Sequence, residues 1–245
     1  MTKIEQLRGV AEDVIVQFDT LVAAWHVADS NEARVTAALA LTVGEQFHSM
    51  LCLIDNNCET HAAAPIRSML EGVADIILLT RDPRYLEQLR FDNAKADNST
   101  IANYRDSIAA DIPAEMASEI ASVLKYASAT RDSLKEEGFK RQTREEKFQL
   151  TQNEYLYAAY GVMCAFVHPN LTSLSSRHMH NVEGVYKLVY RAPPNAKVVS
   201  MLLSIGIYVL TRLIELTCHF TDLAAENVQA IAKNIDDRHD IAVAN

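Results

Sequence analysis

Apolar residues recur along the first part of the chain at alternating spacings of three and four. The pattern is unbroken from residue 3 to residue 28, and its members are Ile4, Leu7, Ala11, Val14, Phe18, Leu21, Trp25 and Ala28. This period predicts one long amphipathic helix with a narrow apolar seam, as in helical bundles and coiled coils. A seam of this kind favours the pairing of two copies if it is exposed, so we expect a homodimer.

Helical patterns separated by short polar breaks continue along the rest of the chain. The predicted helices cover about 31–54, 62–80, 84–110, a segment from 113 onward, 151–167 and 196–235. The third helix, over 62–80, is apolar on nearly every side and is therefore expected to be central. Between 169 and 195 the pattern is irregular, and Val185–Tyr190 is typical of a short strand.

The composition agrees with long helices and few turns, because the 245 residues include only 7 Gly and 6 Pro. We predict an all-α, single-domain bundle of about six or seven helices. A short irregular or β-like insert is expected near 169–195. Within the bundle we distinguish an N-terminal helical pair (1–58), a core (59–235) and a tail (236–245).

Charge and cysteine usage narrow the classes of function. The 23 basic and 32 acidic residues give a net charge of −9, which works against a general nucleic-acid surface but allows a small local basic site. The four cysteines are scattered, without a CxxC pair, as in a reduced cytoplasmic protein. We expect no signal peptide and no membrane span, since the uncharged stretch between Lys197 and Arg212 has 14 residues and a span needs about 20.

Two charged residues stand on the otherwise apolar third helix. Arg67 and Glu71 are four residues apart, so both lie on one face. Charges on a buried helix need a partner or water, because an unpaired buried charge is costly. The pair is therefore either an ion pair that locks the core or part of a polar cluster that lines a pocket.

A second candidate group stands at the end of the predicted helix 151–167. Thr151-Gln-Asn-Glu154 is typical of a capping box that opens this helix, and His168-Pro169 ends it. Tyr160 lies two turns before His168 on the same side. His168 can transfer protons near neutral pH, or it can simply favour the helix end through the macrodipole. Asn170 can orient a ligand or cap the turn.

Metal and cofactor sites have little support in this sequence. His178 and His180 would point the same way in an extended segment, and His168 could join them as ligands, but no acidic or Cys ligand stands at a convincing spacing. Glu45-Gln-Phe-His48 is half of a di-iron signature without its second half. Nucleotide-binding motifs are missing as well. We therefore predict no metal and no cofactor, and keep His178 and His180 as substrate-binding candidates.

Two segments resemble a bacterial family of uncharacterised helical proteins. They are AAAPIRSMLEGVADIILLTRDPRYLEQLRFDNA, with its Arg-x-x-x-Glu helix and an Asp-Pro that opens the next helix, and YLYAAYGVMCAFVHPN, which is Tyr-rich and ends in His-Pro. The resemblance covers about residues 60–220. That family in turn resembles the HEPN helical bundles, many of which are dimeric, metal-independent ribonucleases of toxin–antitoxin and antiphage defence systems.

The HEPN resemblance implies a site built on His168. The family signature has an Arg four to six residues before the His, whereas residues 161–167 of this chain contain no Arg. In a HEPN-like ribonuclease, His168 would be the acid or base, Arg67 from another helix would stabilise the developing charge, Glu71 would orient Arg67, and Tyr160 would position the RNA. The alternative is a non-catalytic helical module that binds a partner protein, with Arg67–Glu71 as a structural ion pair.

Overall fold

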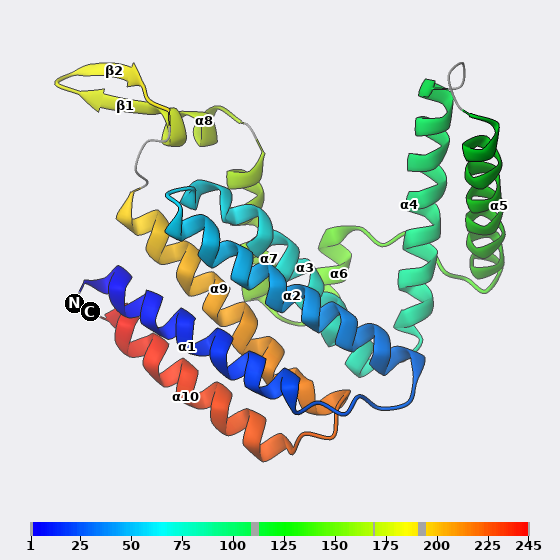
Figure 1. The fold of residues 1–245 in the computed structure, drawn as a ribbon, viewed down its shortest axis with the longest axis horizontal. Helices are drawn as coiled ribbons and strands as arrows, with labels where there is room; N and C mark the ends of the chain where they lie inside the picture. Colours follow the sequence, from blue (N-terminus) through cyan, green and yellow to red (C-terminus); the bar gives the residue numbers. More distant parts are fainter. Residues whose placement is uncertain (1, 109–112, 169, 191–194, 245) are drawn as a thin grey trace. The chain divides into compact units, whose positions relative to one another are not determined.

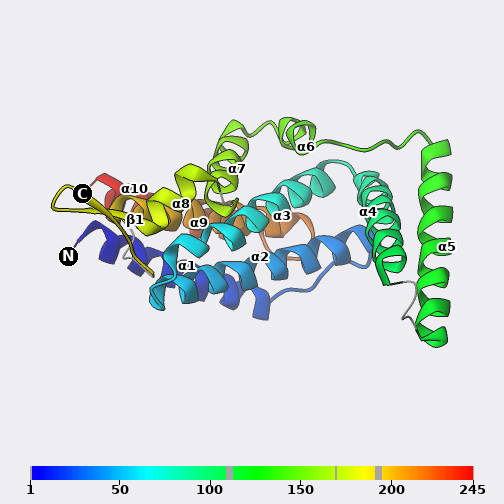
Figure 2. The same cartoon turned by 90° about the horizontal axis from the view of Figure 1, so that it is seen from above.

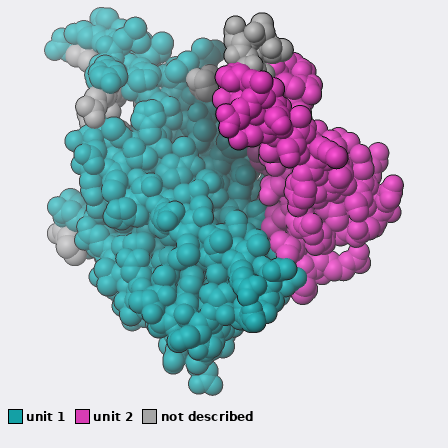
Figure 3. All heavy atoms as spheres, turned by 45° about the vertical axis from the view of Figure 1, so that its right-hand side comes forward, with its two compact units in different colours: residues 1–80, 148–245 teal, residues 81–147 magenta. Residues whose placement is uncertain are grey.

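A computed structural model describes residues 2–108, 113–168, 170–190 and 195–244, with the backbone alone at 172, 176, 180 and 182. The chain forms two compact units, coloured separately in Figure 3. Unit 1 comprises residues 1–80 and 148–245, and unit 2 comprises residues 81–147. The candidate site residues all belong to unit 1.

Helices account for nearly all of unit 1, in which the first and last helices lie side by side (Figures 1 and 2). Its elements are α1 (Lys3–Ala23), α2 (Asn31–Asp55), the 3-10 turn η1 (Glu59–His61), α3 (Ala63–Arg81), α7 (Glu154–Val167), α8 (Leu171–His178), β1 (Met179–Val182), β2 (Val185–Leu188), α9 (Ala196–Leu216), the 3-10 turn η2 (Thr217–His219) and α10 (Ala225–Ala244). The short helix α6 (Arg144–Leu150) leads into this unit.

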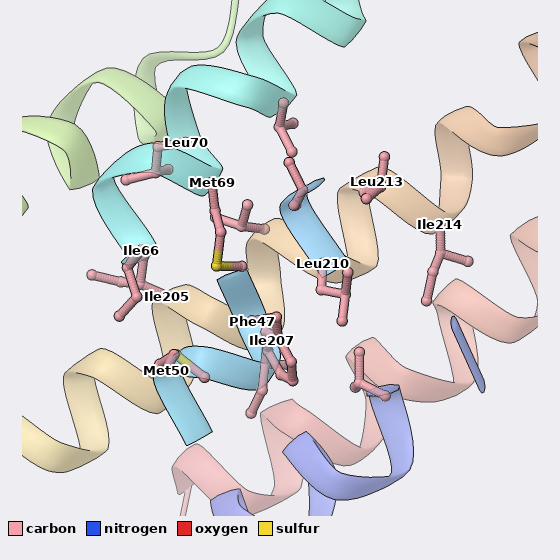
Figure 4. Packing of buried hydrophobic residues seen from close by; sticks show 14 of the residues in the cluster. Phe47, Met50, Ile66, Met69, Leu70, Ile205, Ile207, Leu210, Leu213 and Ile214 are labelled. Carbon is pink, nitrogen blue, oxygen red and sulfur yellow. The ribbon is translucent and has the colours of Figure 1, made fainter. Parts of the chain in front are cut away.

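Helix α9 is the centre of the unit 1 core, packed against α1, α2 and α10. Large side chains of α2, α3 and α9 interdigitate there (Figure 4), among them Phe47, Met50, Ile66, Met69, Ile205 and Leu210. Gly206 allows the close approach of α2, because a Cβ at this position would lie 2.5 Å from the Met50 sulfur. The all-α prediction is confirmed. The helix expected to be central, α3, contributes to the core together with α9.

The apolar seam of α1 is covered by the chain itself. Its central members are buried, namely Leu7, Ala11, Val14, Phe18 and Leu21, and α1 packs on α9 and α10. Thr2 and Glu5 form a capping box that begins the helix. The seam therefore leaves no exposed apolar stripe of the kind from which we expected a homodimer.

The predicted number of helices is wrong: the described residues hold ten α-helices. The largest error is the expected helix 196–235, which is two helices joined by η2. No Gly or Pro marks this break. Thr217 and Thr221 instead bond their hydroxyls to the carbonyls of Ile214 and Thr217, which competes with a continuing helix. Backbone bonds to the α1–α2 loop then hold the turn, from Ala28 to the Phe220 carbonyl and from Asp222 to the His26 carbonyl.

Three further boundaries differ from the sequence expectation or refine it. Helix α7 begins with Asn153 as N-cap, which accepts from the Leu156 amide, so the Thr151 capping box is wrong. Thr151 is buried and donates to the Phe148 carbonyl instead. Residues 236–244, expected to be a tail, continue α10. The insert consists of α8 and an antiparallel β1–β2 hairpin.

Unit 2 is a pair of antiparallel helices, α4 (Tyr85–Ile108) and α5 (Ala114–Glu136). Apolar contact is sparse, with Phe91, Ala94, Ala127 and Leu134 among its buried residues. Polar bonds support the pair. The Asn98 side chain donates to the Ser128 hydroxyl at 2.9 Å, and the side-chain amide of Gln88 donates to the carbonyl of Lys140, just beyond α5, at 2.9 Å.

Two helices in the described residues are long and apolar enough to cross a membrane by length and composition alone, at Asn31–Asp55 and Ala196–His219. A buried helix in a folded core has the same properties. The apolar window of the second segment is 61% buried inside the unit.

Candidate functional site

Three of the four residues expected to be catalytic meet between α3 and α7. Arg67 donates from Nε and Nη2 to the Tyr160 hydroxyl, at 3.3 and 3.1 Å. Its Nη2 also lies 3.4 Å from the Glu71 carboxylate, one turn along α3. The predicted shared face of Arg67 and Glu71 is present, and Tyr160 joins it from a helix more than 90 residues further along the chain.

This Arg67 cluster, made of Arg67, Glu71 and Tyr160, is mostly shielded from water. The Arg67 side chain is 20% exposed, and Tyr160 is buried. The Arg67 guanidinium carbon lies 5.4 Å from the centre of the Tyr160 ring, and Phe148 packs on the same ring at 4.9 Å. The hydrogen bond to Tyr160 raises the pKa of Arg67 above its ordinary value, with smaller contributions from Cys164 and Glu71. The cluster therefore holds a permanent cation in a defined place.

His168 lies away from this cluster, at the C-cap of α7. Its amide donates to the Cys164 carbonyl, and its side chain is exposed. It follows Tyr160 by eight residues, which is about 12 Å along a helix axis. Across the described residues, no hydrogen bond or ion pair joins the His168 ring to Arg67 or Glu71. The structure thus places an accessible imidazole at the helix end, two turns beyond the cluster.

Asn170 uses both atoms of its side-chain amide to shape the turn after α7. Its oxygen accepts from the Ser173 amide at 2.9 Å, as the N-cap of α8, and its nitrogen donates to the Ala165 carbonyl at 3.0 Å. Ser173 completes a capping box and also donates to the His168 carbonyl at 2.8 Å. Of the two roles considered for Asn170, the geometry corresponds to capping, which fixes the backbone around His168.

The two other histidines of the insert lie where α8 meets the hairpin. His178 ends α8, and its Nδ1 donates to the Val189 carbonyl at 3.3 Å. His180 is in β1, but its side chain lies outside the described residues. Within the described part of the chain, no group of three or more His, Cys, Asp or Glu is placed to hold a metal ion.

Arg177 is a residue of this region that the sequence reasoning missed. Its Nη2 donates to the Phe166 carbonyl in the last turn of α7 and to the Thr60 carbonyl at 3.1 Å. No carboxylate pairs with Arg177 among the described residues, and its Nε is buried without a hydrogen-bond partner. Burial lowers the pKa of Arg177. Arg177 remains charged all the same, because an arginine pKa starts so high. Its charge is therefore not neutralised by a carboxylate among the described residues at the end of α7.

Two grooves lie elsewhere in unit 1, between α1 and α10. They have volumes of about 280 and 260 Å³, and both include Arg238 in their lining. The larger is bordered by Gly9, Val10 and Ile241, the smaller by Asp13 and Ile231. Neither groove is lined by residues of the 169–195 insert.

The comparisons with known proteins give one family. A family model described as a family of unknown function, DUF5677, matches residues 33–186, which is more than half of the chain. The chain belongs to this family. The matched region runs from α2 into β2 and so includes the Arg67 cluster, His168 and Arg177. The searches of curated proteins and of solved structures find no match.

Proposed function

We propose that this member of DUF5677 is a HEPN-like, metal-independent ribonuclease whose site lies at the C-terminal end of α7. One observation carries the proposal. The backbone amide of the exposed His168 donates to the Cys164 carbonyl, and the Arg177 guanidinium donates to the Phe166 carbonyl, so both residues lie at the same helix end. Arg177 has no carboxylate partner among the described residues. A group that transfers protons beside a cation that can hold a phosphate is the minimal equipment for phosphodiester cleavage.

The chemistry needs no external reactant. His168 accepts the proton of an RNA 2′-hydroxyl while the 2′-oxygen bonds to the adjacent phosphorus and the 5′-oxygen leaves, or it supplies the proton that this leaving oxygen takes up. The products are a 2′,3′-cyclic phosphate and a 5′-hydroxyl. Arg177 stabilises the additional negative charge that develops on the phosphoryl oxygens.

Arg67, Glu71 and Tyr160 act in this proposal as positioning residues. Arg67 already donates to Tyr160 and lies beside Glu71, so its charge is balanced within the protein. The cluster joins α3 to α7 and so fixes the position of α7 against α3. Arg67 was our first candidate for stabilising the developing charge. The proposal gives this role to Arg177 because, within the described part of the chain, Arg177 has no acidic partner.

The HEPN resemblance suggests the biological setting. A cytoplasmic ribonuclease of this kind would act as a toxin in stress or antiphage defence, as the HEPN resemblance implies, and would work as a homodimer. Growth arrest on expression, relieved by His168→Ala, is the expected cellular result.

The test is cleavage of single-stranded RNA by the full chain in the presence of EDTA. We expect fragments with 2′,3′-cyclic phosphate and 5′-hydroxyl ends from the wild type and a loss of at least 100-fold in His168→Ala, in line with removing a proton-transfer group. Equal rates in the two proteins, or no cleavage by either, would overturn the proposal. Circular dichroism of the variant checks that it is folded.

A second candidate function has one observation in its favour. Within the Arg67 cluster, Glu71 balances the charge of Arg67, as in a structural ion pair. This arrangement fits a non-catalytic helical module that binds a partner protein. On this alternative no RNA is cleaved, and Arg67→Met affects stability alone.

A further inference from the structure

The charges of this chain are distributed very unevenly along the sequence. Residues 155–214 contain five basic residues (Arg177, Lys187, Arg191, Lys197 and Arg212) and one acidic residue, Glu183, a balance of 5 − 1 = +4. The total of −9 leaves −13 for all other residues. Arg212 is paired with Glu215 and Asp236, so the attraction of this segment for anions comes from its other cations. The segment with α8 and the hairpin is still less acidic than the rest of the protein, and it favours anionic partners that the rest of the surface repels.

The β1–β2 hairpin exposes an unusual number of large side chains. Antiparallel pairing places Tyr186 opposite Asn181 and Leu188 opposite Met179, so these four residues share one face of the ribbon. Exposure is 74% for Tyr186, 79% for Leu188 and 48% for Met179, and Tyr190, two residues beyond Leu188, is 87% exposed. We call Met179, Tyr186 and Leu188, together with the exposed Tyr190 just after β2, the hairpin face.

Such a face points to a binding role, because contiguous exposed apolar surface marks interaction sites. An isolated two-stranded hairpin is marginally stable in water. This one is fastened to α8 by two bonds between His178 and Val189, one from the Val189 amide to the His178 carbonyl and one from the His178 ring. In Figure 1 the ribbon projects from the helices of unit 1, with α8 at its base.

We infer that the hairpin face is a stacking platform for single-stranded RNA. Proteins that bind single strands combine exposed aromatic rings, on which bases stack, with cations along the backbone path. Tyr186 and Tyr190 supply the rings. Arg177, at the end of α8, and Lys187, on the opposite face of the ribbon from Tyr186, supply cations beside the platform. The identification of the strand as RNA rests on the proposed ribonuclease function. The platform would hold the strand whose phosphate is cleaved at His168.

The charge of the segment decides between this partner and other occupants of an apolar face. A second copy of the chain carries the same positive segment, so pairing two hairpin faces brings like charges together. A base-paired duplex hides its base faces inside the helix, so the tyrosines favour a single strand over a duplex.

The experiment is fluorescence anisotropy of the full chain with a labelled 12-nucleotide 2′-O-methyl RNA. This probe lacks the free 2′-hydroxyl, so it is bound without being cleaved. We expect Tyr186→Ala and Tyr190→Ala each to weaken binding roughly ten-fold, the scale of one lost base stack. Lys187→Glu is expected to weaken binding and to flatten its salt dependence by about one phosphate contact or more. The duplex form of the probe is expected to bind more weakly than the single strand.

Matched variants in unit 2 serve as controls, because they change the same residue types at exposed positions. These are Tyr104→Ala, with a tyrosine that is 52% exposed, and Lys125→Glu. Unchanged affinity in the hairpin variants, equal losses in the controls, equal binding of the duplex, or no binding by the wild type would each overturn the platform. Self-association that Tyr186→Ala abolishes, with RNA affinity unchanged, would assign the face to a second copy instead.

Failure of the platform and failure of the ribonuclease proposal give different results. Binding of the 2′-O-methyl probe without cleavage of unmodified RNA would reject the ribonuclease and keep the platform as a single-strand binding surface. Cleavage that is independent of Tyr186 and Tyr190, in rate and in KM, would keep the ribonuclease and reject the platform.

Discussion

Two arginines contact helix α7, and their partners differ in kind. Arg67 meets α7 at Tyr160, with a carboxylate on its own helix and an aromatic ring beneath its guanidinium. Arg177 meets α7 at its last turn, where it is bound to two backbone carbonyls and has no acidic partner among the described residues. Carbonyls orient a guanidinium without neutralising it. The first arginine can therefore serve as a lock, while the second keeps its charge for a ligand.

Arg177→Gln should give the largest effect, on cleavage. The amide keeps a donor for the carbonyls but removes the cation, so we expect RNA cleavage to fall about 100-fold or more while the protein remains folded. The measurement is the initial rate on a labelled oligoribonucleotide. A rate within a few fold of the wild type would remove Arg177 from the site.

Arg67→Met should act on stability instead. The change removes the charged donor of the Tyr160 hydroxyl and one ion-pair partner of Glu71, and we expect a loss of about 2 kcal/mol in the free energy of unfolding. Urea denaturation measures it, and Arg34→Met, at an exposed surface ion pair, is the matched control with an expected loss below about 0.5 kcal/mol. A stable Arg67→Met protein without cleavage would reverse the roles of the two arginines.

Asn170→Ala sharpens the comparison at the turn that carries His168 and Arg177. Losing the α8 cap should cost about 1 kcal/mol. Asn170→Asp keeps the acceptor for the Ser173 amide and loses the donor to Ala165, so its loss should be smaller. Thermal unfolding of the two variants provides the ranking, and equal losses would show that capping is not what Asn170 contributes.

The smallest predicted effect is on the pH dependence of stability. It comes from His239, a structural histidine, and not from the exposed His168. Burial lowers the pKa of His239 below its ordinary 6.5, against the opposing pull of Asp240 and Asp236. As the pH falls below about 6.5, the unfolded chain takes up this proton before the folded one, so stability is full above 6.5 and decreases below it. His239→Gln should reduce that decrease in urea titrations between pH 7.5 and 5.5. An identical decrease in the variant would assign it to other groups.

Sequence patterns anticipated the parts of this structure that depend on local rules. The residue before a proline avoids the helical region, so the end of α7 at His168 was predictable. Spacing of four placed Arg67 and Glu71 on one face. The meeting of Arg67 with Tyr160, by contrast, depends on how α3 packs on α7, and no local pattern encodes that distance.

The missed features share this dependence on tertiary structure. The break after α9 is held by bonds to the α1–α2 loop, a segment almost 200 residues away along the chain. Arg177 belongs to no motif, because what sets it apart is that it has no acidic partner in the part of the chain that the structure describes. The one signal in the sequence that could have found it is the nearly acid-free stretch 155–214.

The most direct test of a site at the end of α7 is a double-variant cycle on RNA cleavage with His168→Ala, Arg177→Gln and the two combined. Residues that act together in one catalytic step are not additive. We predict that the combined variant is about as slow as the slower single variant, all three being folded by circular dichroism. Losses that multiply, or a combined variant as active as the wild type, would contradict a shared site at the end of α7.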